Sequence, residues 1–280
     1  MTRYLAFALL LIAASPAHAA EKRLDRTFAV SPGGKLVVDA DSASVRVSGS
    51  DTNQVTVRMN ARGTEDDLAD TKFEAVQNAD GVTVTMRRQR NGGWFNWGPW
   101  YGEKHVEVTV PRRYGVNIRT GGGSVELRDT TGPATLRTSG GDVTAKNVNG
   151  NVELRTSGGG ILADTIRGDI DADTSGGDVR LLQVDGKIRG NTSGGNVRCS
   201  LVGTNRGISA TTSGGDIELT LPRSVAGNLE VVTSGGDISS DLPVTATVLK
   251  DHHLRGTLNG GGPLVEARTS GGGIKLRTAN

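Results

Sequence analysis

The chain contains 280 residues, with 32 Lys and Arg residues against 30 Asp and Glu residues. Because both signs of charge are interleaved and no basic stripe is present, the sequence does not indicate a nucleic-acid partner. A single cysteine, Cys199, excludes an internal disulfide framework. The 41 glycines, set against only 8 prolines, favour a tight, often repeated turn over a conventional globular enzyme.

Residues 1–19 have the features of a signal peptide. Arg3 is followed by an apolar run over residues 4–14, a Ser-Pro break at 15–16 and the small-x-small pattern Ala-His-Ala at 17–19. The apolar run is shorter than the roughly 20 residues that span a bilayer, so a retained membrane anchor is the less favoured alternative. We therefore expect cleavage after Ala19, no lipid attachment there, and a periplasmic or secreted protein.

Residues 20–110 are less regular than the repetitive body that we expect over residues 111–280. Alternation of apolar and polar residues predicts strands at residues 35–39, 45–48, 55–59 and 82–87. A capping box, Thr-Glu-Asp-Asp at residues 64–67, predicts a short helix that extends through about Gln77. Its expected apolar contacts are Leu68, Phe73 and Val76. We expect this helix to cover the open first coil of the body, because exposed strand edges need protection.

All three tryptophans of the chain lie close together, after a cluster of arginines and before a strand that begins near Val106. Aromatic side chains on a loop can stack on sugars or lie at a membrane interface. The alternative is a lid that folds back on the body, with arginine stacked on tryptophan. The candidate ligand-binding residues are Trp94, Phe95, Trp97, Trp100, Tyr101, Arg88 and Arg90.

A four-residue motif, Thr-Ser-Gly-Gly, recurs through the second half of the chain. It begins at Thr138, Thr156, Thr174, Thr192, Thr212, Thr233 and Thr269, with a variant, Thr-Gly-Gly-Gly, at Thr120. The spacings after Thr138 are 18, 18, 18, 20, 21 and 36 residues, and the last of these predicts two units with one degenerate copy between them. Such regularity indicates a repeat architecture.

Each repeat predicts two short strands joined by two turns. With the threonine as position one, position six is always aliphatic: Val125, Val143, Ile161, Val179, Val197, Ile217, Ile238 and Ile274. Position eight is mostly apolar, and a second alternating stretch follows in the better-preserved units. Stacking the units at the ~4.8 Å strand spacing would build a continuous core. We therefore predict an all-β fold, a single-stranded parallel β-helix (a β-solenoid) with about 18 residues per coil.

The handedness of the coil and the roles of its corner follow from the same positions. A left-handed hexapeptide helix would repeat its apolar positions every six residues, which this chain does not do, so a right-handed coil is favoured. The threonine should point inward, and the glycine pair should serve a positive φ angle or close contact between coils. Position five alternates Asp with Gly or Asn, apart from an expected meeting of Asp216 with Asp237. One carboxylate per turn is too few for calcium, so no metal is expected.

Signals of catalysis are absent from the sequence. Cys199 occupies an inward position, and a serine that recurs in every repeat is a poor candidate nucleophile. We therefore expect no enzymatic activity and no cofactor. The alternative is a polysaccharide lyase or hydrolase of the kind that right-handed β-helices carry. Its nearest candidate cluster is Asp171, Asp173, Asp178 and Arg180.

The strand of residues 106–111, the Thr-Ser-Gly-Gly-Asp-Ile-Glu-Leu-Thr-Leu-Pro run at 212–222 and the glycine-rich close at 260–274 carry a family resemblance. Over about residues 30–278 the chain resembles a bacterial β-strand-repeat family of unknown function, often labelled "putative adhesin". The resemblance implies a scaffold or binding module of the cell envelope. We expect a protein or glycan partner, with possible peripheral contact of the aromatic loop with a membrane.

Overall fold

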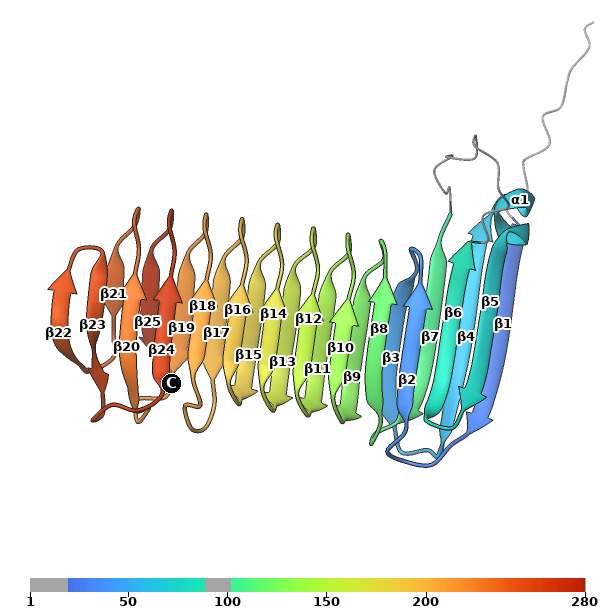
Figure 1. Ribbon diagram of the computed structural model, residues 1–280, viewed down its shortest axis with the longest axis horizontal. Helices are drawn as coiled ribbons and strands as arrows, with labels where there is room; N and C mark the ends of the chain where they lie inside the picture. The colour runs from blue at the N-terminus through green and yellow to red at the C-terminus, as the bar shows by residue number, and fades with distance from the viewer. Residues whose placement is uncertain (1–19, 89–101, 280) are drawn as a thin grey trace, which may run out of the picture.

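Strands are the dominant element of the computed structural model, which describes residues 20–88 and 102–279. Within these residues the strands form one sheet of 12 strands (sheet A) and one of 13 strands (sheet B), which face each other along the molecule (Figure 1). The one helix in the described ranges is α1 (Glu65–Ala69). The predicted all-β class is confirmed. The proposed signal peptide and the segment 89–101 lie outside the described residues.

Neighbouring strands within each sheet do not simply follow the order of the chain. In spatial order, sheet A consists of β1 (Ala20–Ala29), β4 (Gln54–Gly63), β7 (Lys104–Pro111), β3 (Ser44–Ser50), β9 (Val125–Thr131), β11 (Val143–Asn149), β13 (Ile161–Arg167), β15 (Val179–Asp185), β17 (Val197–Leu201), β19 (Ile217–Leu221), β25 (Ile274–Thr278) and β21 (Ile238–Ser240). In spatial order, sheet B consists of β22 (Val244–Lys250), β23 (His253–Leu258), β20 (Gly227–Val232), β24 (Leu264–Arg268), β18 (Ile208–Thr211), β16 (Ile188–Asn191), β14 (Ile170–Asp173), β12 (Val152–Arg155), β10 (Ala134–Arg137), β8 (Gly115–Thr120), β2 (Lys35–Ala40), β6 (Gly81–Arg88) and β5 (Thr71–Asn78).

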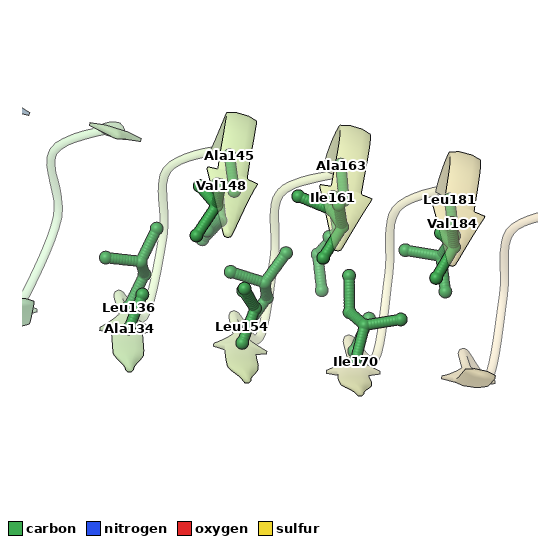
Figure 2. Close-up of a cluster of buried hydrophobic side chains, with 14 of the residues drawn as sticks. Ala134, Leu136, Ala145, Val148, Leu154, Ile161, Ala163, Ile170, Leu181 and Val184 are labelled. Carbon is green, nitrogen blue, oxygen red and sulfur yellow. The ribbon is translucent and has the colours of Figure 1, made fainter. Parts of the chain in front are cut away.

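In the middle of the molecule, each strand pairs in parallel with the strand one repeat away. Val143 of β11 pairs with Val125 on one side and Ile161 on the other, and Leu136 of β10 pairs with Leu154 of β12. The predicted inward positions are buried, and Figure 2 shows such side chains filling the space between the sheets. Full burial of a Val, Leu or Ile side chain stabilises the fold by about 1.5–3 kcal/mol. The predicted repeat period therefore sets the register.

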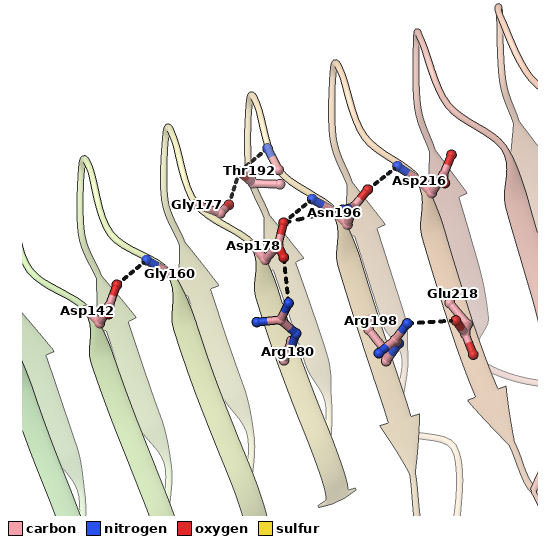
Figure 3. Close-up of polar contacts among 11 residues, drawn as sticks. Asp142, Gly160, Gly177, Asp178, Arg180, Thr192, Asn196, Arg198, Asp216 and Glu218 are labelled. Atoms are coloured by element: carbon pink, nitrogen blue, oxygen red, sulfur yellow. Dashed lines mark hydrogen bonds and ion pairs between the residues drawn. The ribbon is translucent and has the colours of Figure 1, made fainter.

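The threonine that opens each motif points inward, as predicted. Thr174 is 2% exposed, and its hydroxyl donates a hydrogen bond of 2.8 Å to the carbonyl of Gly159 in the preceding coil. Thr192 makes the same bond to Gly177 (Figure 3). The hydroxyls therefore bond to backbone carbonyls of the adjacent coil, and each bond holds two coils together at this corner.

The glycines of the motif allow close contact between coils. A Cβ atom at Gly159 would lie 2.2 Å from the carbonyl oxygen of Gly141 in the neighbouring coil. Gly159 does not have a positive φ angle, so close approach is the correct one of the two predicted reasons. The positive φ angles occur at the opposite corner, where Gly150 has φ 153° and Gly168 has φ 147°.

The N-terminal end differs from the predicted arrangement. The four predicted strands of this region are β2, β3, β4 and β6. The helix does not extend through Gln77: it ends at Ala69, and residues 71–78 form β5, antiparallel to β6. The pairing energy of a long strand beside β6 outweighs the local helical pattern. The first coil, β2 and β3, lies between the β6–β7 coil and the β8–β9 coil, so both of its edges are paired with strands and the prediction that the helix covers an open first coil is wrong.

The C-terminal end also departs from simple sequential stacking. The last strands, β24 and β25, are inserted inside the stack: β24 lies between β18 and β20, and β25 lies between β19 and β21 (Figure 1). The predicted degenerate copy is wrong, because the intervening residues form β21 and an antiparallel hairpin of β22 and β23.

The insertion changes which position-five residues are neighbours. The backbone N–H of Gly273 donates to the carboxylate of Asp216 at 2.8 Å, and Ile274, which follows Gly273, pairs with Ile238, which follows Asp237. A glycine therefore separates the two aspartates that were predicted to meet. The alternation of carboxylates with Gly or Asn consequently continues to the end of the stack, which avoids repulsion between adjacent like charges.

Candidate functional site

Seven residues were predicted to bind a ligand, and six of them lie outside the described residues: Arg90, Trp94, Phe95, Trp97, Trp100 and Tyr101. The segment 89–101 connects β6 in sheet B to β7 in sheet A. The strand ends that flank it, at β6 and β7, lie at the same edge of the sheets as the glycine motifs of the regular repeats. The described residues at its base, Arg88 and Lys104, show how that edge is built.

Arg88, the seventh predicted residue, is part of an ion-pair network. Its guanidinium lies 2.9 Å from a carboxylate oxygen of Asp67 in α1, and its backbone N–H donates to Asp41 at 2.6 Å. Asp67 is itself held by Thr64, whose hydroxyl donates to the carboxylate at 2.9 Å and accepts a hydrogen bond from the backbone N–H of Asp67 at 3.2 Å, the second of which is the bond of a helix N-cap. Arg88 therefore anchors the base of the segment to α1, and its side chain is only 25% exposed.

Lys104 begins β7 and is 6% exposed. Burial lowers the pKa of its ammonium group, while the nearby Asp41 carboxylate opposes this shift and Arg88 adds to it. A cation so deep at a strand terminus is unusual unless it is compensated, and two carboxylates, Asp41 and Asp67, provide negative charge here. The segment thus leaves from a charged, mostly buried base.

A groove that sequence analysis missed lies beside this base, on the outer face of sheet A. It has a volume of about 370 Å³ and runs over β1, β4 and β7. Its lining residues are Arg23, Arg58, Met59, Asn60, Arg62, Glu103, His105 and Glu107. The lining contains both positively and negatively charged side chains, which supply hydrogen-bond donors and acceptors side by side. Such a mixture suits a polar ligand rather than a single anion or cation. The pairing of β4 with β1 on one side and β7 on the other, which places Asn60 beside both Arg23 and His105, brings these residues together.

At the glycine corners of the repeats, the polar side chains at position five form hydrogen bonds with the adjacent coil. Asp178 accepts a hydrogen bond from the backbone N–H of Asn196 at 2.9 Å, and Asn196 accepts one from the backbone N–H of Asp216 at 2.8 Å (Figure 3). Asp142 contacts Gly160 in the same way at 2.8 Å. Position five therefore caps the backbone of the next coil. Among the described residues, no group of three His, Cys, Asp or Glu side chains could hold a metal ion.

The four residues of the alternative enzymatic cluster do not come together. Asp171 and Asp173 lie on β14 in sheet B, where Arg155 pairs with them at 3.0 and 3.4 Å. Asp178 and Arg180 belong to the sheet A side of the coil and pair with each other at 2.6 Å. Outward side chains of the two sheets point away from each other, so the four residues make no common site.

Cys199 lies in the core, where no solvent reaches it. Burial raises the pKa of its thiol to about 12, so the sulfur stays protonated at neutral pH. A thiolate is the reactive form of cysteine. The predicted inward position of Cys199 is confirmed.

Two facing sheets and a corner that recurs once in every repeat define a β-solenoid-like repeat protein. Residues 34–277 match the family described as Toastrack DUF4097, a bacterial family of unknown function, and the chain belongs to it. The family resemblance predicted from the sequence is confirmed. None of the helices in the described part of the chain is long and apolar enough to cross a membrane.

Two solved structures share the fold at low sequence identity. One, from Bacteroides fragilis, is described as a "putative adhesin": it is 12% identical, with a TM-score of 0.51, and the match covers 91% of this chain and 97% of that chain. The other, from Parabacteroides distasonis, is described as a "putative lipid binding protein": it is 16% identical, with a TM-score of 0.50 and coverage of 91% and 96%. The comparison with curated proteins finds no match. Such identities show a common fold alone.

Proposed function

We propose that this protein is a non-enzymatic binding module of the cell envelope, exported and either periplasmic or secreted, that contacts glycan or protein through the segment 89–101. The observation that carries the proposal is the concentration of three tryptophans, Phe95 and Tyr101 in one short segment of an otherwise repetitive sequence. The regular repeats have a short glycine motif at the equivalent place in the sequence, so this segment differs from them in both length and composition.

The base of the segment supports the proposal. Arg88 is tied to Asp67 of α1 and to Asp41, and Lys104 is buried next to them. A binding loop needs a rigid origin if its ends are to stay in place. The names of the two similar structures, an adhesin and a lipid-binding protein, agree with a binding role in the envelope.

The start of the mature chain and the handedness of its coil are also proposals. We propose a mature chain that starts after Ala19 and winds as a single-stranded, right-handed coil, with α1 and β5 covering its N-terminal end. The spacing of the apolar positions supports the handedness, and the position of α1 beside β1 and β4 supports the cover (Figure 1).

The experiment compares two triple variants of Trp94, Trp97 and Trp100. Replacement of all three by Ala should lower retention by isolated envelope fractions at least tenfold, whereas replacement by Phe, which keeps aromatic faces for stacking, should lower it much less. Arms with purified envelope glycan, envelope protein and anionic lipid vesicles identify the partner class. Equal retention of the wild type and the Ala variant in every arm contradicts the proposal.

Thermal melting of the same Ala variant tests the alternative of a lid. If the tryptophans were packed on the body, each Trp→Ala change would cost roughly 3–5 kcal/mol and the triple variant would melt far earlier or fail to fold. For a contact surface we expect a melting temperature close to that of the wild type. A large decrease together with retained binding contradicts the proposed site.

A further inference from the structure

An open hollow of about 730 Å³ lies at the N-terminal end, at the edge of the sheets opposite the corner that carries α1 (Figure 1). Three turns form it: the turn from β1 to β2 at residues 30–34, the turn from β3 to β4 with Asn53, and the turn from β5 to β6 at residues 79–80. Its volume is within the range of small-ligand sites in proteins. None of its residues belongs to the segment 89–101.

The three turns are tied together, so the hollow is formed in advance. The backbone N–H of Lys35 donates to the Asp80 carbonyl at 2.8 Å, and that of Val30 donates to the Asn53 carbonyl at 3.0 Å. The amide of Gln77 donates to the Ala29 carbonyl at 2.8 Å. A site that does not need to be ordered on binding loses less affinity to conformational entropy.

Tyr114 lines the hollow, and its buried hydroxyl is the feature that points to a ligand. Its side chain is 1% exposed, yet its hydroxyl has no hydrogen-bond partner in the described part of the chain. A buried hydroxyl without a partner costs roughly 1–3 kcal/mol, whereas phenylalanine would fill the same space without that cost. Burial also raises the pKa of Tyr114, so the hydroxyl remains a protonated donor at neutral pH.

The hydroxyl packs against the backbone of two glycines. A Cβ atom at Gly34 would lie 2.8 Å from the Tyr114 hydroxyl oxygen, and one at Gly81 would lie 2.7 Å from it. Both glycines line the hollow themselves. Only backbone of these two residues therefore lies where side chains would otherwise crowd the phenol.

The rest of the lining indicates the chemistry of the ligand. It offers a hydroxyl from Ser31, amides from Asn53, Gln77 and Asn78, and one carboxylate from Asp80, with no Lys, Arg or His among the lining residues. Amides and hydroxyls both donate and accept, which suits a hydroxyl-rich ligand. The single carboxylate disfavours an anion.

We propose that this hollow binds a neutral saccharide unit, one of whose oxygens accepts a hydrogen bond from the Tyr114 hydroxyl. The site is separate from the segment 89–101, so the proposal stands or falls independently of the proposed function. A binding site built around a buried hydroxyl discriminates strongly between ligands that pair with it and ligands that do not.

The test uses Tyr114→Phe, with Thr130→Val as its matched control. The Thr130 hydroxyl is also buried without a partner in the described residues, but Thr130 does not line the hollow. Binding of maltotriose and of the N-acetylglucosamine trimer is followed by NMR titration up to about 20 mM, a range that covers weak sugar affinities. We expect one of them to bind and to shift the amide signals of Gly33, Asp80 and Gly81.

Tyr114→Phe should weaken that binding at least fivefold and leave the melting temperature unchanged or higher, while Thr130→Val leaves the affinity as it is. Glucuronate, which is anionic, should bind more weakly than glucose. The proposal is overturned if neither trisaccharide shifts these signals, or if Tyr114→Phe binds as well as the wild type. A lower melting temperature of Tyr114→Phe also overturns it, because the hydroxyl would then already be satisfied by a buried water.

Discussion

Some buried hydroxyl groups of this molecule donate a hydrogen bond, and others have no partner among the described residues. The threonines at the corner are almost fully buried, but each donates to a carbonyl of the adjacent coil, as Thr174 does to Gly159. The hydroxyls of Tyr114 and Thr130 are as deeply buried without a partner among the described residues. Satisfied and unsatisfied buried hydroxyls differ in free energy by enough to be measured one side chain at a time.

We predict that Thr174→Val lowers the free energy of unfolding by about 1–2 kcal/mol, because the Gly159 carbonyl loses its donor at a partly buried corner. Thr144→Val is the matched control, since Thr144 is partly exposed on the outward side of β11. Urea denaturation of the three proteins measures the difference. Equal midpoints for both variants would mean that the corner hydroxyls contribute nothing.

Because Cys199 is buried, we predict that the free energy of unfolding decreases at alkaline pH. Its pKa is about 12 in the fold against an ordinary value of 9.0, so only the unfolded chain ionises between these values. The contribution of Cys199 is complete below pH 9.0 and decreases as the pH rises toward 12, by roughly 1.4 kcal/mol per pH unit. Cys199→Ala should lack this slope. Denaturation series for both proteins above pH 9.0 measure it, and parallel curves would contradict the prediction.

At the scale of the element, the corner glycines predict two different outcomes for the same substitution. Gly159→Ala places a Cβ atom 2.2 Å from the Gly141 carbonyl oxygen, so two coils must separate, and we expect a cost of about 1–3 kcal/mol. Gly158→Ala places its Cβ atom 3.4 Å from the nearest atom and should be tolerated. Melting temperatures of the pair test this. Similar values for both variants would show that the coils are not in close contact at this corner.

The strands of the repeats could be predicted because each pairs with the same position one repeat away, so a local pattern determines register. Helix α1 could be predicted from its capping residues, but Phe73 could not be assigned to β5, because that depends on pairing with β6. The insertion of β25 was not predictable, since Gly273 fits beside any position-five carboxylate. The groove and the hollow depend on pairing between distant strands, as with Asn60 and His105, which no local pattern contains.

On the scale of the whole molecule, both ends interrupt sequential stacking. At one end the β2–β3 coil lies inside the β6–β7 coil, and at the other the β24–β25 coil lies inside the β20–β21 coil. Antiparallel strands then finish the N-terminal end, where β1 carries charges that disfavour pairing with another chain. The last strands of the chain are consequently interior strands.

Two deletions of equal length should therefore differ sharply. Removal of residues 143–160, one complete internal repeat, leaves coils that still match in register, and we expect a folded protein with a modestly lower melting temperature. Removal of residues 263–280, a segment of the same length, takes away β24 and β25, so that the strands on either side of them each lose a neighbour inside the stack, and we expect a much larger loss or aggregation. Circular dichroism melts compare them. Equal losses would contradict the interior position of β24 and β25.

The interior position of β24 and β25 also concerns the order in which the molecule can be completed. A ribosome releases residues 264–278 after residues 208–240, so the coils on either side of β24 and β25 are synthesised before the strands that join them. Until residues 264–278 are in place, the facing edges of β18 and β20 lack the strand that lies between them, and a strand of another molecule could pair there instead. The stack is therefore completed by strands that enter between coils synthesised before them.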